Sequence, residues 1–334
     1  MRPDEPARIG RTTLHVSRLG VGTVALGNMY EAVPESAAAD VLDEAGKWGL
    51  THFDTAPLYG MGLAERRIGP LLATRPRDSF VLSTKVGRLL RADAPIDPRT
   101  LRDGKPLFVD TPPLNPVFDF SYDATLRCVE ESLERLGLDR VDILYLHDPD
   151  DHYEQALNGA YRALERLRGE GAVTAIGAGM TQTRMLAQFA RAGDFDCFLL
   201  AGRYTLLDQS ALTELLPLCQ ARGISLVIGG VYNSGILTNP VPGARYDYRG
   251  APPELVSRAQ RIAAICARHD VPLKAAAIQF PFGHPAVASV LTGVRSSAEL
   301  AENAAMLSLP IPPQMWEELR AEDLLSQEVP VPAV

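Results

Sequence analysis

The sequence predicts an α/β fold in which eight parallel strands, each followed by a helix, close into a (β/α)8 barrel. Short apolar segments alternate with amphipathic helical segments along the whole chain, which is typical of right-handed βαβ units and a parallel sheet. The alternation occurs eight times, the number that closes a TIM barrel. No GxGxxG motif follows the first strand-like segment, which disfavours the competing doubly wound open sheet.

Each predicted element has its own sequence pattern. The strand-like segments are residues 19–26, 51–56, 80–85, 141–147, 173–179, 197–202, 224–230 and 287–293. The helix-like segments are residues 35–46, 63–73, 122–136, 154–170, 182–191, 208–222, 253–269 and 297–307, with a further helical stretch at 273–281. Gly137 and Gly171 mark the ends of the third and fourth helices, because glycine adopts the left-handed conformation that terminates a helix.

Two long insertions interrupt the alternation, one after the third strand (residues 88–120) and one after the seventh (residues 233–252). Loops of this length are usually functional or disordered. Because both follow strands, they should overhang the C-terminal mouth of the barrel. We expect them to form ordered substrate walls, since they contain the aromatic residues Phe108, Phe118, Phe120, Tyr246 and Tyr248.

Composition and charge limit the functional class. The 334 residues suit one barrel domain over residues 1–334. The net charge of −8, from 41 acidic and 33 basic residues, argues against broad binding to nucleic acid. The N-terminus has no apolar leader and the chain has no long apolar span, so we expect a soluble, cytoplasmic protein that does not enter a membrane. The oligomeric state is not indicated.

The four cysteines are far apart and include no CxxC pair. They are Cys128, Cys197, Cys219 and Cys266. A disulfide framework or a zinc site needs closer spacing, so the sequence predicts free thiols and no metal.

Four polar residues follow or end three successive strand-like segments. Asp54 and Tyr59 lie in HFDTAPLYG, Lys85 in FVLSTKVG and His147 in VDILYLHD. Consecutive strands of a parallel barrel are neighbours, and their C-terminal ends meet at one mouth. The sequence therefore predicts that a carboxylate, a phenol, an amine and an imidazole face one pocket.

These four groups can form an acid–base site for a carbonyl or hydroxyl substrate. A tyrosine hydroxyl has a pKa near 10, and a neighbouring ammonium favours its phenolate form. We expect Tyr59 to transfer the proton, Lys85 to tune it and Asp54 to orient Lys85, while His147 fixes a substrate oxygen. None of these groups carries electrons, so a redox reaction requires a cofactor.

Taken singly, each residue also has a structural interpretation. Asp54 could form a turn or cap a helix, Lys85 could be solvated, and Tyr59 and His147 could be core residues. The coincidence of all four at consecutive strand ends favours the catalytic interpretation.

The segments FDTAPLYG, STKVG and YLHDPD, with the helix and strand of residues 122–147, resemble the aldo-keto reductase superfamily. The resemblance covers residues 8–310 in order. It implies a (β/α)8 barrel that binds a nicotinamide dinucleotide without a Rossmann motif, and it places the family's catalytic tetrad at Asp54, Tyr59, Lys85 and His147.

Within this family, AGRYTLLDQ, VYNSGIL and AIGAGMTQ resemble the sugar-oxidising branch of D-threo-aldose 1-dehydrogenases, also called L-fucose or L-galactose dehydrogenases. Pyridoxal 4-dehydrogenases are similar. The resemblance implies oxidation of a cyclic hemiacetal to a lactone, with Tyr59 taking the proton of the C1 hydroxyl. A general aldehyde or ketone reductase is an alternative.

The resemblance also implies a set of cofactor contacts. They are Gly22, Thr23, Asp54, Tyr232, Asn233, Ser234, Gly293, Arg295, Ser296, Glu299, Glu302 and Asn303. The residues that the family uses near the nicotinamide differ in this sequence. Gly179 and Met180 stand in place of the expected Ser-Asn pair, Ala201 in place of a glutamine, and Gly229 in place of a stacking tyrosine. Thr181 or Gln182 could replace the missing amide contacts.

Residues 291–303 correspond to the segment that binds the adenosine end. Ser296 and Ser297 can cap a helix and bind an anion at its N-terminus. Glu299 stands where many members have a basic residue, and a carboxylate there repels a 2′-phosphate. The guanidinium of Arg295 would instead favour a 2′-phosphate, and so NADP. The balance favours NAD over NADP.

Two other functional classes compete with this assignment. A metal-dependent hydrolase could use His52, Asp54, His147 and Asp148, although His52 is more simply a packed core residue and no further ligands follow later strands. A nucleotide-binding regulatory subunit is the non-enzymatic alternative, which the intact tetrad disfavours.

Overall fold

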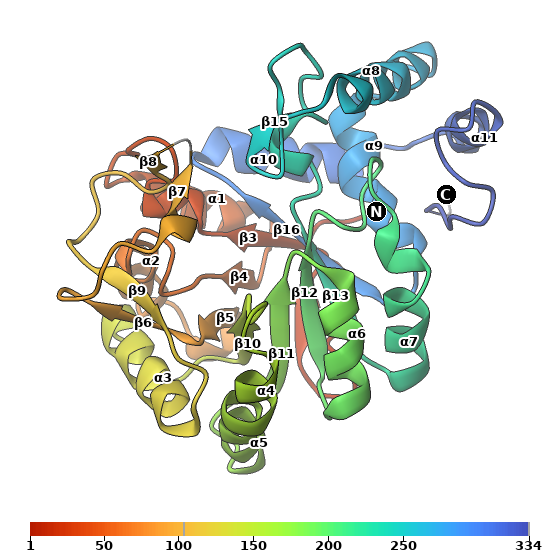
Figure 1. The fold of residues 1–334 in the computed structure, drawn as a ribbon. Helices are drawn as coiled ribbons and strands as arrows, with labels where there is room; N and C mark the ends of the chain where they lie inside the picture. The colour runs from red at the N-terminus through yellow and green to blue at the C-terminus, as the bar shows by residue number, and fades with distance from the viewer. Residues whose placement is uncertain (103, 333–334) are drawn as a thin grey trace.

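The computed structural model, which describes residues 1–102 and 104–332, contains a closed barrel of eight parallel strands (Figure 1). In chain order the strands are β3 (Leu19–Gly22), β4 (His52–Asp54), β5 (Val81–Val86), β10 (Ile143–His147), β11 (Ala175–Met180), β12 (Cys197–Ala201), β13 (Ser225–Gly229) and β16 (Val287–Gly293). Each strand pairs with the next, and β16 pairs with β3 to close the ring. The predicted TIM barrel is confirmed.

Helices surround the barrel, as the alternating pattern predicts (Figure 1). They are α1 (Ala37–Lys47), α2 (Leu63–Leu72), α3 (Tyr122–Leu136), α5 (Tyr161–Gly169), α6 (Thr183–Ala192), α7 (Leu215–Arg222), α8 (Pro253–Arg268), α9 (Leu273–Gln279), α10 (Ser297–Ser308) and α11 (Pro313–Ala321). The last helix, α11, was not predicted. It buries Met315, Trp316 and Leu319 and packs on α8.

Two predicted helices differ from the structure. The segment 154–170 is divided into α4 (Tyr153–Gln155), a π-helical turn (Ala156–Ala160) and α5. Within the wider turn, Gly159 lies against the backbone of Phe120 so closely that a Cβ atom would be 2.5 Å from its carbonyl oxygen. The helix predicted from residue 208 begins only at Leu215, because the Asp208 carboxylate accepts the Ser210 N–H at 2.8 Å and forms a local turn instead.

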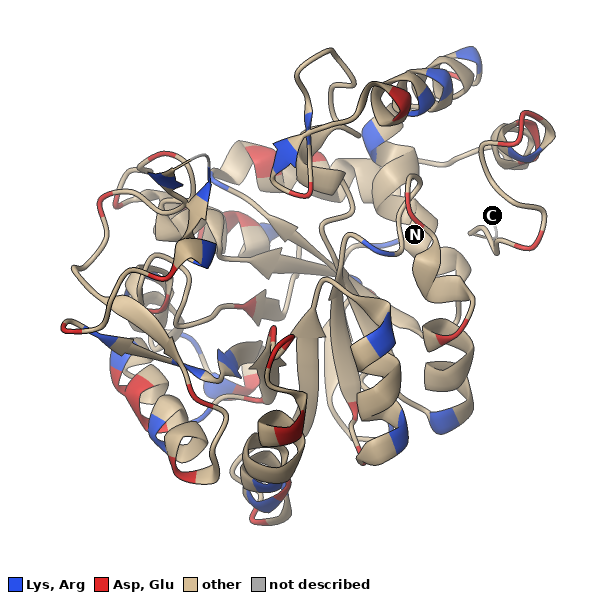
Figure 2. Cartoon of the chain, viewed as in Figure 1, with Lys and Arg blue, Asp and Glu red and all other residues tan. Residues whose placement is uncertain are grey.

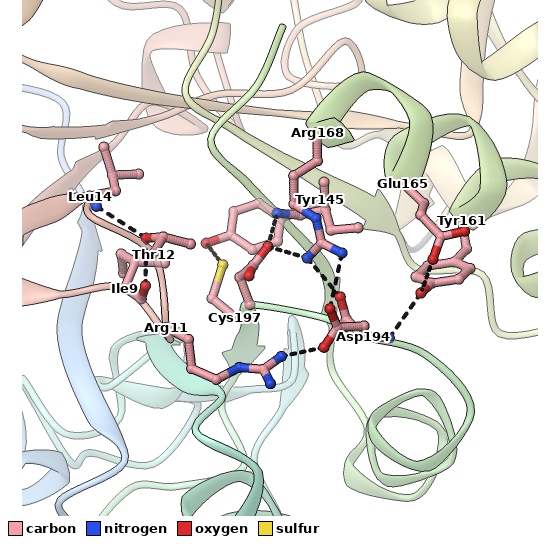
Figure 3. Close-up of polar contacts among 12 residues, drawn as sticks. Ile9, Arg11, Thr12, Leu14, Tyr145, Tyr161, Glu165, Arg168, Asp194 and Cys197 are labelled. Atoms are coloured by element: carbon pink, nitrogen blue, oxygen red, sulfur yellow. Dashed lines mark hydrogen bonds and ion pairs between the residues drawn. The ribbon is translucent and has the colours of Figure 1, made fainter. Parts of the chain in front are cut away.

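The barrel interior has its own hydrophobic cluster, separate from the core between strands and helices. An N-terminal hairpin, β1 (Pro6–Arg8) and β2 (His15–Ser17), contributes Ala7, Ile9 and Val16 to this interior cluster. The hairpin, which the sequence did not predict, closes the end of the barrel opposite the C-terminal mouth. Figure 3 shows its turn held by an ion pair between Arg11 and Asp194.

That closed end has further polar contacts in Figure 3. Arg168 also reaches Asp194, and its Nη1 lies 2.8 Å from Asp196 Oδ2. Inside the barrel, Cys197 Sγ lies 3.5 Å from the hydroxyl of Tyr145. All four cysteines are free and buried, as the spacing predicts. The two arginines described here, Arg11 and Arg168, pair with the carboxylates of Asp194 and Asp196. We therefore interpret these contacts as structural.

The two insertions lie at the mouth, as predicted, and each folds into small hairpins. In the first, β6 (Arg88–Arg91) pairs with β9 (Asn115–Phe118), and β7 (Leu101–Arg102) with β8 (Lys105–Pro106). In the second, β14 (Arg245–Tyr246) pairs with β15 (Arg249–Gly250). Phe108 and Phe120 are buried, so these two aromatic residues pack the insertion instead of forming an open wall.

The outer surface carries mixed charge. Figure 2 shows Lys and Arg interspersed with Asp and Glu on the surrounding helices. No helix in the described part of the chain is both long and apolar enough to span a membrane.

The contact between α2 and α3 gives a stability prediction. Gly69 lies in α2 so close to α3 that a Cβ would be 2.0 Å from the carbonyl oxygen of Leu136. Gly69→Ala should therefore lower the free energy of unfolding by about 1–3 kcal/mol, although alanine is normally the better helix former. Gly169→Ala is the control, because its Cβ would meet nothing within 4 Å. Urea denaturation of both variants tests this, and equal stability would contradict the close contact.

Candidate active site

The four predicted catalytic side chains meet at the C-terminal mouth. Asp54 ends β4, Lys85 lies one residue before the end of β5, and His147 ends β10. These three strands are consecutive neighbours in the barrel. Tyr59 lies in the turn between β4 and α2. The structure thus brings together the residues that the sequence places at successive strand ends.

Lys85 is the centre of this group. Its ammonium Nζ donates to Asp54 Oδ2 at 2.6 Å, to the carbonyl of Thr55 at 2.9 Å and to Tyr59 Oη at 3.0 Å. Only 2% of Lys85 is exposed. The other carboxylate oxygen of Asp54 accepts the Ser83 hydroxyl at 2.7 Å. The ammonium therefore has three acceptors, which together fix its position.

The protonation states follow from burial and charge. Burial works to lower the pKa of Lys85, but the Asp54 carboxylate and Tyr59 outweigh it and raise that pKa above its ordinary value. Burial raises the pKa of Tyr59, and the opposing charge of Lys85 does not offset it. Lys85 acts in the expected direction, since its charge and hydrogen bond lower the pKa of Tyr59, but burial raises that pKa by more, so the net shift is upward.

The turn that carries Tyr59 is fixed by a close backbone contact. Gly60, with φ of +65°, lies so near the loop after β3 that a Cβ would be 2.4 Å from the carbonyl oxygen of Gly27. Glycine is required at such a position both for its positive φ and for the space. The Tyr59 carbonyl then accepts the Ala64 N–H at 3.1 Å, inside the first turn of α2.

His147 completes the group as a neutral imidazole. Its ring is perpendicular to that of Tyr59, with centroids 5.9 Å apart. Burial, followed by the charges of Arg88 and Lys85, lowers its pKa well below the ordinary value. Its Nδ1 is buried and has no hydrogen-bond partner among the described residues. A neutral imidazole has one N–H donor and one nitrogen acceptor, so it can form a hydrogen bond with a substrate oxygen without becoming charged.

An ion pair beside His147 was not predicted as part of the site. Arg88 Nη2 lies 2.7 Å from Asp148 Oδ2, and Asp148 Oδ2 lies 3.6 Å from His147 Nε2. Burial raises the pKa of Asp148, while Arg88 opposes this shift. The available sequence signals were the position of Arg88 at the start of the first insertion and that of Asp148 directly after His147.

The ends of β11, β12 and β13, where the family resemblance implies the nicotinamide, carry small side chains on the side that faces the mouth. Gly179, Ala201 and Gly229 lie at or near the ends of β11, β12 and β13. Gln182, considered as a replacement contact, donates from Nε2 to Asp150 Oδ1 at 2.5 Å. The strand ends on this side therefore form a floor of small residues.

Three buried polar atoms on the β3, β13 and β16 side fit a dinucleotide. The Thr23 and Thr292 hydroxyls and Asn233 Oδ1 are buried without hydrogen-bond partners among the described residues. Buried polar groups are normally satisfied, so these three atoms are free to bond polar groups of a ligand. Gly22 and Gly293 end the paired strands β3 and β16 beside them, where backbone can approach a ligand closely. The residues present fit the cofactor that the family resemblance implies.

The predicted adenosine segment forms a capped helix N-terminus at α10. The Ser296 hydroxyl accepts the Glu299 N–H at 3.3 Å, and Glu299 Oε2 accepts the Arg295 N–H at 2.8 Å, an arrangement close to a capping box. Arg295 Nε lies 3.2 Å from Glu31 Oε1. The Glu299 carboxylate thus has a structural role, and the Arg295 guanidinium lies within ion-pair distance of the exposed Glu31 carboxylate without forming a hydrogen bond to it through Nε.

Other predicted cofactor residues contact one another. Tyr232 donates its hydroxyl to Asn303 Oδ1 at 2.8 Å, which joins the loop after β13 to α10. Ser234 accepts the N–H of Tyr248 at 3.0 Å and so holds the β14–β15 hairpin. Glu302 pairs with Lys274 at 2.7 Å. These contacts hold the rim of the cofactor side together.

His52 does not join the site. Its Nδ1 lies 3.1 Å from the Ser289 hydroxyl inside the barrel, and burial lowers its pKa to about 3. Across the described ranges, no three His, Cys, Asp or Glu side chains are close enough together to hold a metal ion. The four residues considered for a metal-dependent hydrolase are therefore not assembled as ligands.

The barrel and its buried acid–base group define an enzyme, and comparison with known proteins identifies its class. The model of the aldo/keto reductase family matches residues 18–323, and the chain belongs to this family. It is therefore an oxidoreductase. Aldo/keto reductases use a nicotinamide dinucleotide, NAD or NADP.

Individual relatives cover nearly the whole chain. It is 44% identical to a D-threo-aldose 1-dehydrogenase of Pseudomonas sp., with 97% of this chain and 99% of the relative covered. It is 41% identical to a pyridoxal 4-dehydrogenase of Microbacterium luteolum, with 98% and 99% covered. Among solved structures, the holo form of an aldo-keto reductase of Bacillus halodurans matches with a TM-score of 0.75, 25% identity and 97% of both chains covered.

The central ion pair gives a second stability prediction. Removing one member of a buried pair leaves an uncompensated charge, so Lys85→Met should cost about 3–5 kcal/mol of unfolding free energy. The double variant Asp54→Asn/Lys85→Met removes both charges and should lose less than the sum of the two single losses. Denaturant unfolding of all four proteins tests the coupling. Additive losses would mean that the two groups act independently.

Proposed function

We propose that this enzyme oxidises the C1 hemiacetal of an aldose to a lactone with NAD or NADP, using Tyr59 as the general acid/base. The observation that carries the proposal is the 3.0 Å contact between Lys85 Nζ and Tyr59 Oη beside a neutral His147. The similarity to D-threo-aldose 1-dehydrogenase supports an aldose of the L-fucose or D-threo type as substrate.

The cofactor site is assigned to the β3, β13 and β16 side of the mouth. Thr23, Asn233 and Thr292 would hold polar groups of the dinucleotide, and the N-terminus of α10 would face its adenosine phosphates. When bound, the nicotinamide supplies the two-electron acceptor that the protein side chains lack.

The side chains of the chain itself move and stabilise the proton. In its deprotonated form, Tyr59 Oη accepts the proton of the C1 hydroxyl during oxidation and becomes a phenol; in reduction the phenol gives this proton to the carbonyl oxygen and becomes a phenolate. Lys85 stabilises the phenolate in both directions, and Asp54 holds Lys85 in place. His147, being neutral, exchanges a hydrogen bond with the same C1 oxygen and keeps it against Tyr59.

A pyridoxal or simple aldehyde substrate is the second candidate. The same acid–base group would serve either compound, and the 41% identity to a pyridoxal 4-dehydrogenase favours pyridoxal among them.

We further propose that NAD is preferred to NADP. Arg295, the residue that could bind a 2′-phosphate, is directed to Glu31 at 3.2 Å. Glu299 adds a second carboxylate at the same helix N-terminus. Two carboxylates and one paired guanidinium disfavour a further phosphate.

A substrate panel tests the proposed function directly. Aldoses, pyridoxal and simple aldehydes are assayed in both directions with NAD and with NADP, and dinucleotide reduction is followed by absorbance. The proposal expects an aldose with NAD to give the highest kcat/KM. A higher value for pyridoxal would favour the second candidate, and no aldose oxidation with either dinucleotide would refute the proposal.

The role of Tyr59 gives a prediction with a pH dependence. Tyr59→Phe should lower kcat at least about 100-fold and leave the affinity for the dinucleotide near wild type. In the wild type, kcat/KM for oxidation should rise with pH, because oxidation needs the deprotonated form of a phenol whose pKa is raised. Steady-state kinetics from neutral to alkaline pH measure this. A pH-independent rate, or loss of dinucleotide binding together with kcat, would contradict the assignment.

The cofactor preference gives a prediction about Glu31 and Glu299. Glu31→Gln should release Arg295 and raise the affinity for NADP relative to NAD several-fold. Glu299→Gln should act in the same direction while keeping an acceptor for the Arg295 N–H. Dissociation constants from fluorescence quenching test both variants, with Arg162→Gln as a control, since Arg162 pairs with Glu165 on the exposed face of α5. If both variants keep the wild-type ratio of the NADP and NAD dissociation constants, Glu31 and Glu299 do not determine the cofactor preference.

A further inference from the structure

Asp148 lies next to the imidazole of His147. Its Oδ2 is 3.6 Å from His147 Nε2, which is beyond a hydrogen bond. Asp148 takes a positive φ of 43°, an uncommon conformation for a residue other than glycine that often marks a functional site. Its N–H donates to the carbonyl of Gly179 at 3.0 Å. The carboxylate is thus held by its backbone at the edge of the reacting centre.

Arg88 fixes this carboxylate from the first insertion. Gly87, with φ of +100°, turns the chain from β5 into β6, and a Cβ there would be 2.0 Å from the ring of Phe120. The turn sends Arg88 back over the mouth, opposite Phe118 on β9. The guanidinium carbon lies 4.7 Å from the centre of the Phe118 ring and Nη2 binds Asp148 at 2.7 Å.

The cluster has unused hydrogen-bonding capacity. Arg88 is 8% and His147 6% exposed, yet Arg88 Nε and His147 Nδ1 have no hydrogen-bond partners among the described residues. The recorded contacts of the Asp148 carboxylate to Arg88 and His147 both use Oδ2. Because 31% of this side chain is exposed, a ligand can still reach a carboxylate oxygen.

We propose that Asp148 is a specificity-determining residue that accepts a hydrogen bond from the C2 hydroxyl of the aldose, and that Arg88 is the positioning residue that holds it. This inference rests on the proposed function. His147 and Tyr59 hold the oxygen on C1, and the C2 hydroxyl is attached to the adjacent carbon. Asp148, directly after His147 in the chain, offers a carboxylate acceptor on that side.

The chemistry gives this contact discriminating power. A hydrogen bond to a charged group is stronger than one between neutral groups. A site that binds a substrate hydroxyl disfavours an analogue that lacks it, because the hydrogen bond to that hydroxyl is then lost. The sequence places no charged side chain at the ends of β11, β12 and β13, so those strand ends cannot supply an equivalent contact.

A purely structural role for the Arg88–Asp148 pair makes a different prediction. If the pair only holds the first insertion in place, its loss would lower the activity on all substrates by the same factor. If Asp148 contacts the C2 hydroxyl, its loss would affect only substrates with that hydroxyl. The ratio of kcat/KM for a substrate with the C2 hydroxyl to kcat/KM for one without it therefore distinguishes the two roles.

The experiment compares the best aldose of the substrate panel with its 2-deoxy counterpart. We expect the wild type to prefer the 2-hydroxy sugar about tenfold or more in kcat/KM. Asp148→Asn should reduce this preference to near one, mainly through the KM of the 2-hydroxy sugar. Arg88→Met should do the same, and Arg88→Lys should restore part of the preference because it returns the charge without the planar fork.

Matched controls are Asp151→Asn, whose side chain is 81% exposed in the same loop, and Arg91→Met on the same strand as Arg88, which pairs with Glu131. Both should keep the wild-type ratio, and melting temperatures report folding. If Asp148→Asn does not fold, the test rests on Arg88→Lys and Arg88→Met. In these variants the ratio of kcat/KM for the 2-hydroxy and 2-deoxy sugars shows whether the C2 preference is lost.

The outcomes separate this inference from the proposed function. Absence of aldose oxidation by the wild type would refute both. Aldose oxidation with no C2 preference, or with a preference that Asp148→Asn and Arg88→Met leave unchanged, would refute the inference alone.

Discussion

The buried ammonium of Lys85 is the interaction on which the rest of the site depends. With 2% of the residue exposed, its charge is stable only because Asp54, the Thr55 carbonyl and Tyr59 surround it as acceptors. Backbone pairing places β4 beside β5, and the ammonium then links the Asp54 carboxylate on β4 to the turn that carries Thr55 and Tyr59. The ammonium also influences proton transfer at Tyr59. Burial raises the pKa of Tyr59, and the charge of Lys85 partly opposes this rise, so the phenolate forms more easily than it would without Lys85.

The surrounding elements preserve this arrangement. The contact of Gly60 with Gly27 holds the Tyr59 turn against the loop after β3, and Ser83 orients the Asp54 carboxylate. On the other side, the Arg88–Asp148 pair lies beside His147, and after burial the positive charge of Arg88 helps to lower the pKa of that imidazole. The barrel thus supplies the reacting groups, and the insertions add the groups that meet the rest of the substrate.

Residue patterns alone predicted the barrel, the positions of both insertions and the meeting of the four polar side chains, because strand order determines which C-terminal ends are neighbours. They did not predict the N-terminal hairpin, whose strands have three residues each and little periodicity. Nor did they predict the capping role of Glu299 or the pairing of Arg88 with Asp148. Both depend on the conformation of loops, where long-range contacts outweigh local propensity. The raised pKa of Tyr59 depends on burial, which the sequence around it does not specify.

The ionisation of Tyr59 shows directly how the Lys85 ammonium acts on the hydroxyl beside it. The difference between the ultraviolet titrations of the wild type and Tyr59→Phe isolates this hydroxyl, and the same difference measured in a Lys85→Met background shows what the ammonium contributes. The account predicts that Tyr59 titrates above the usual tyrosine range in the wild type and at still higher pH without Lys85. Titration at or below that range, or a midpoint that Lys85→Met leaves unchanged, would contradict it.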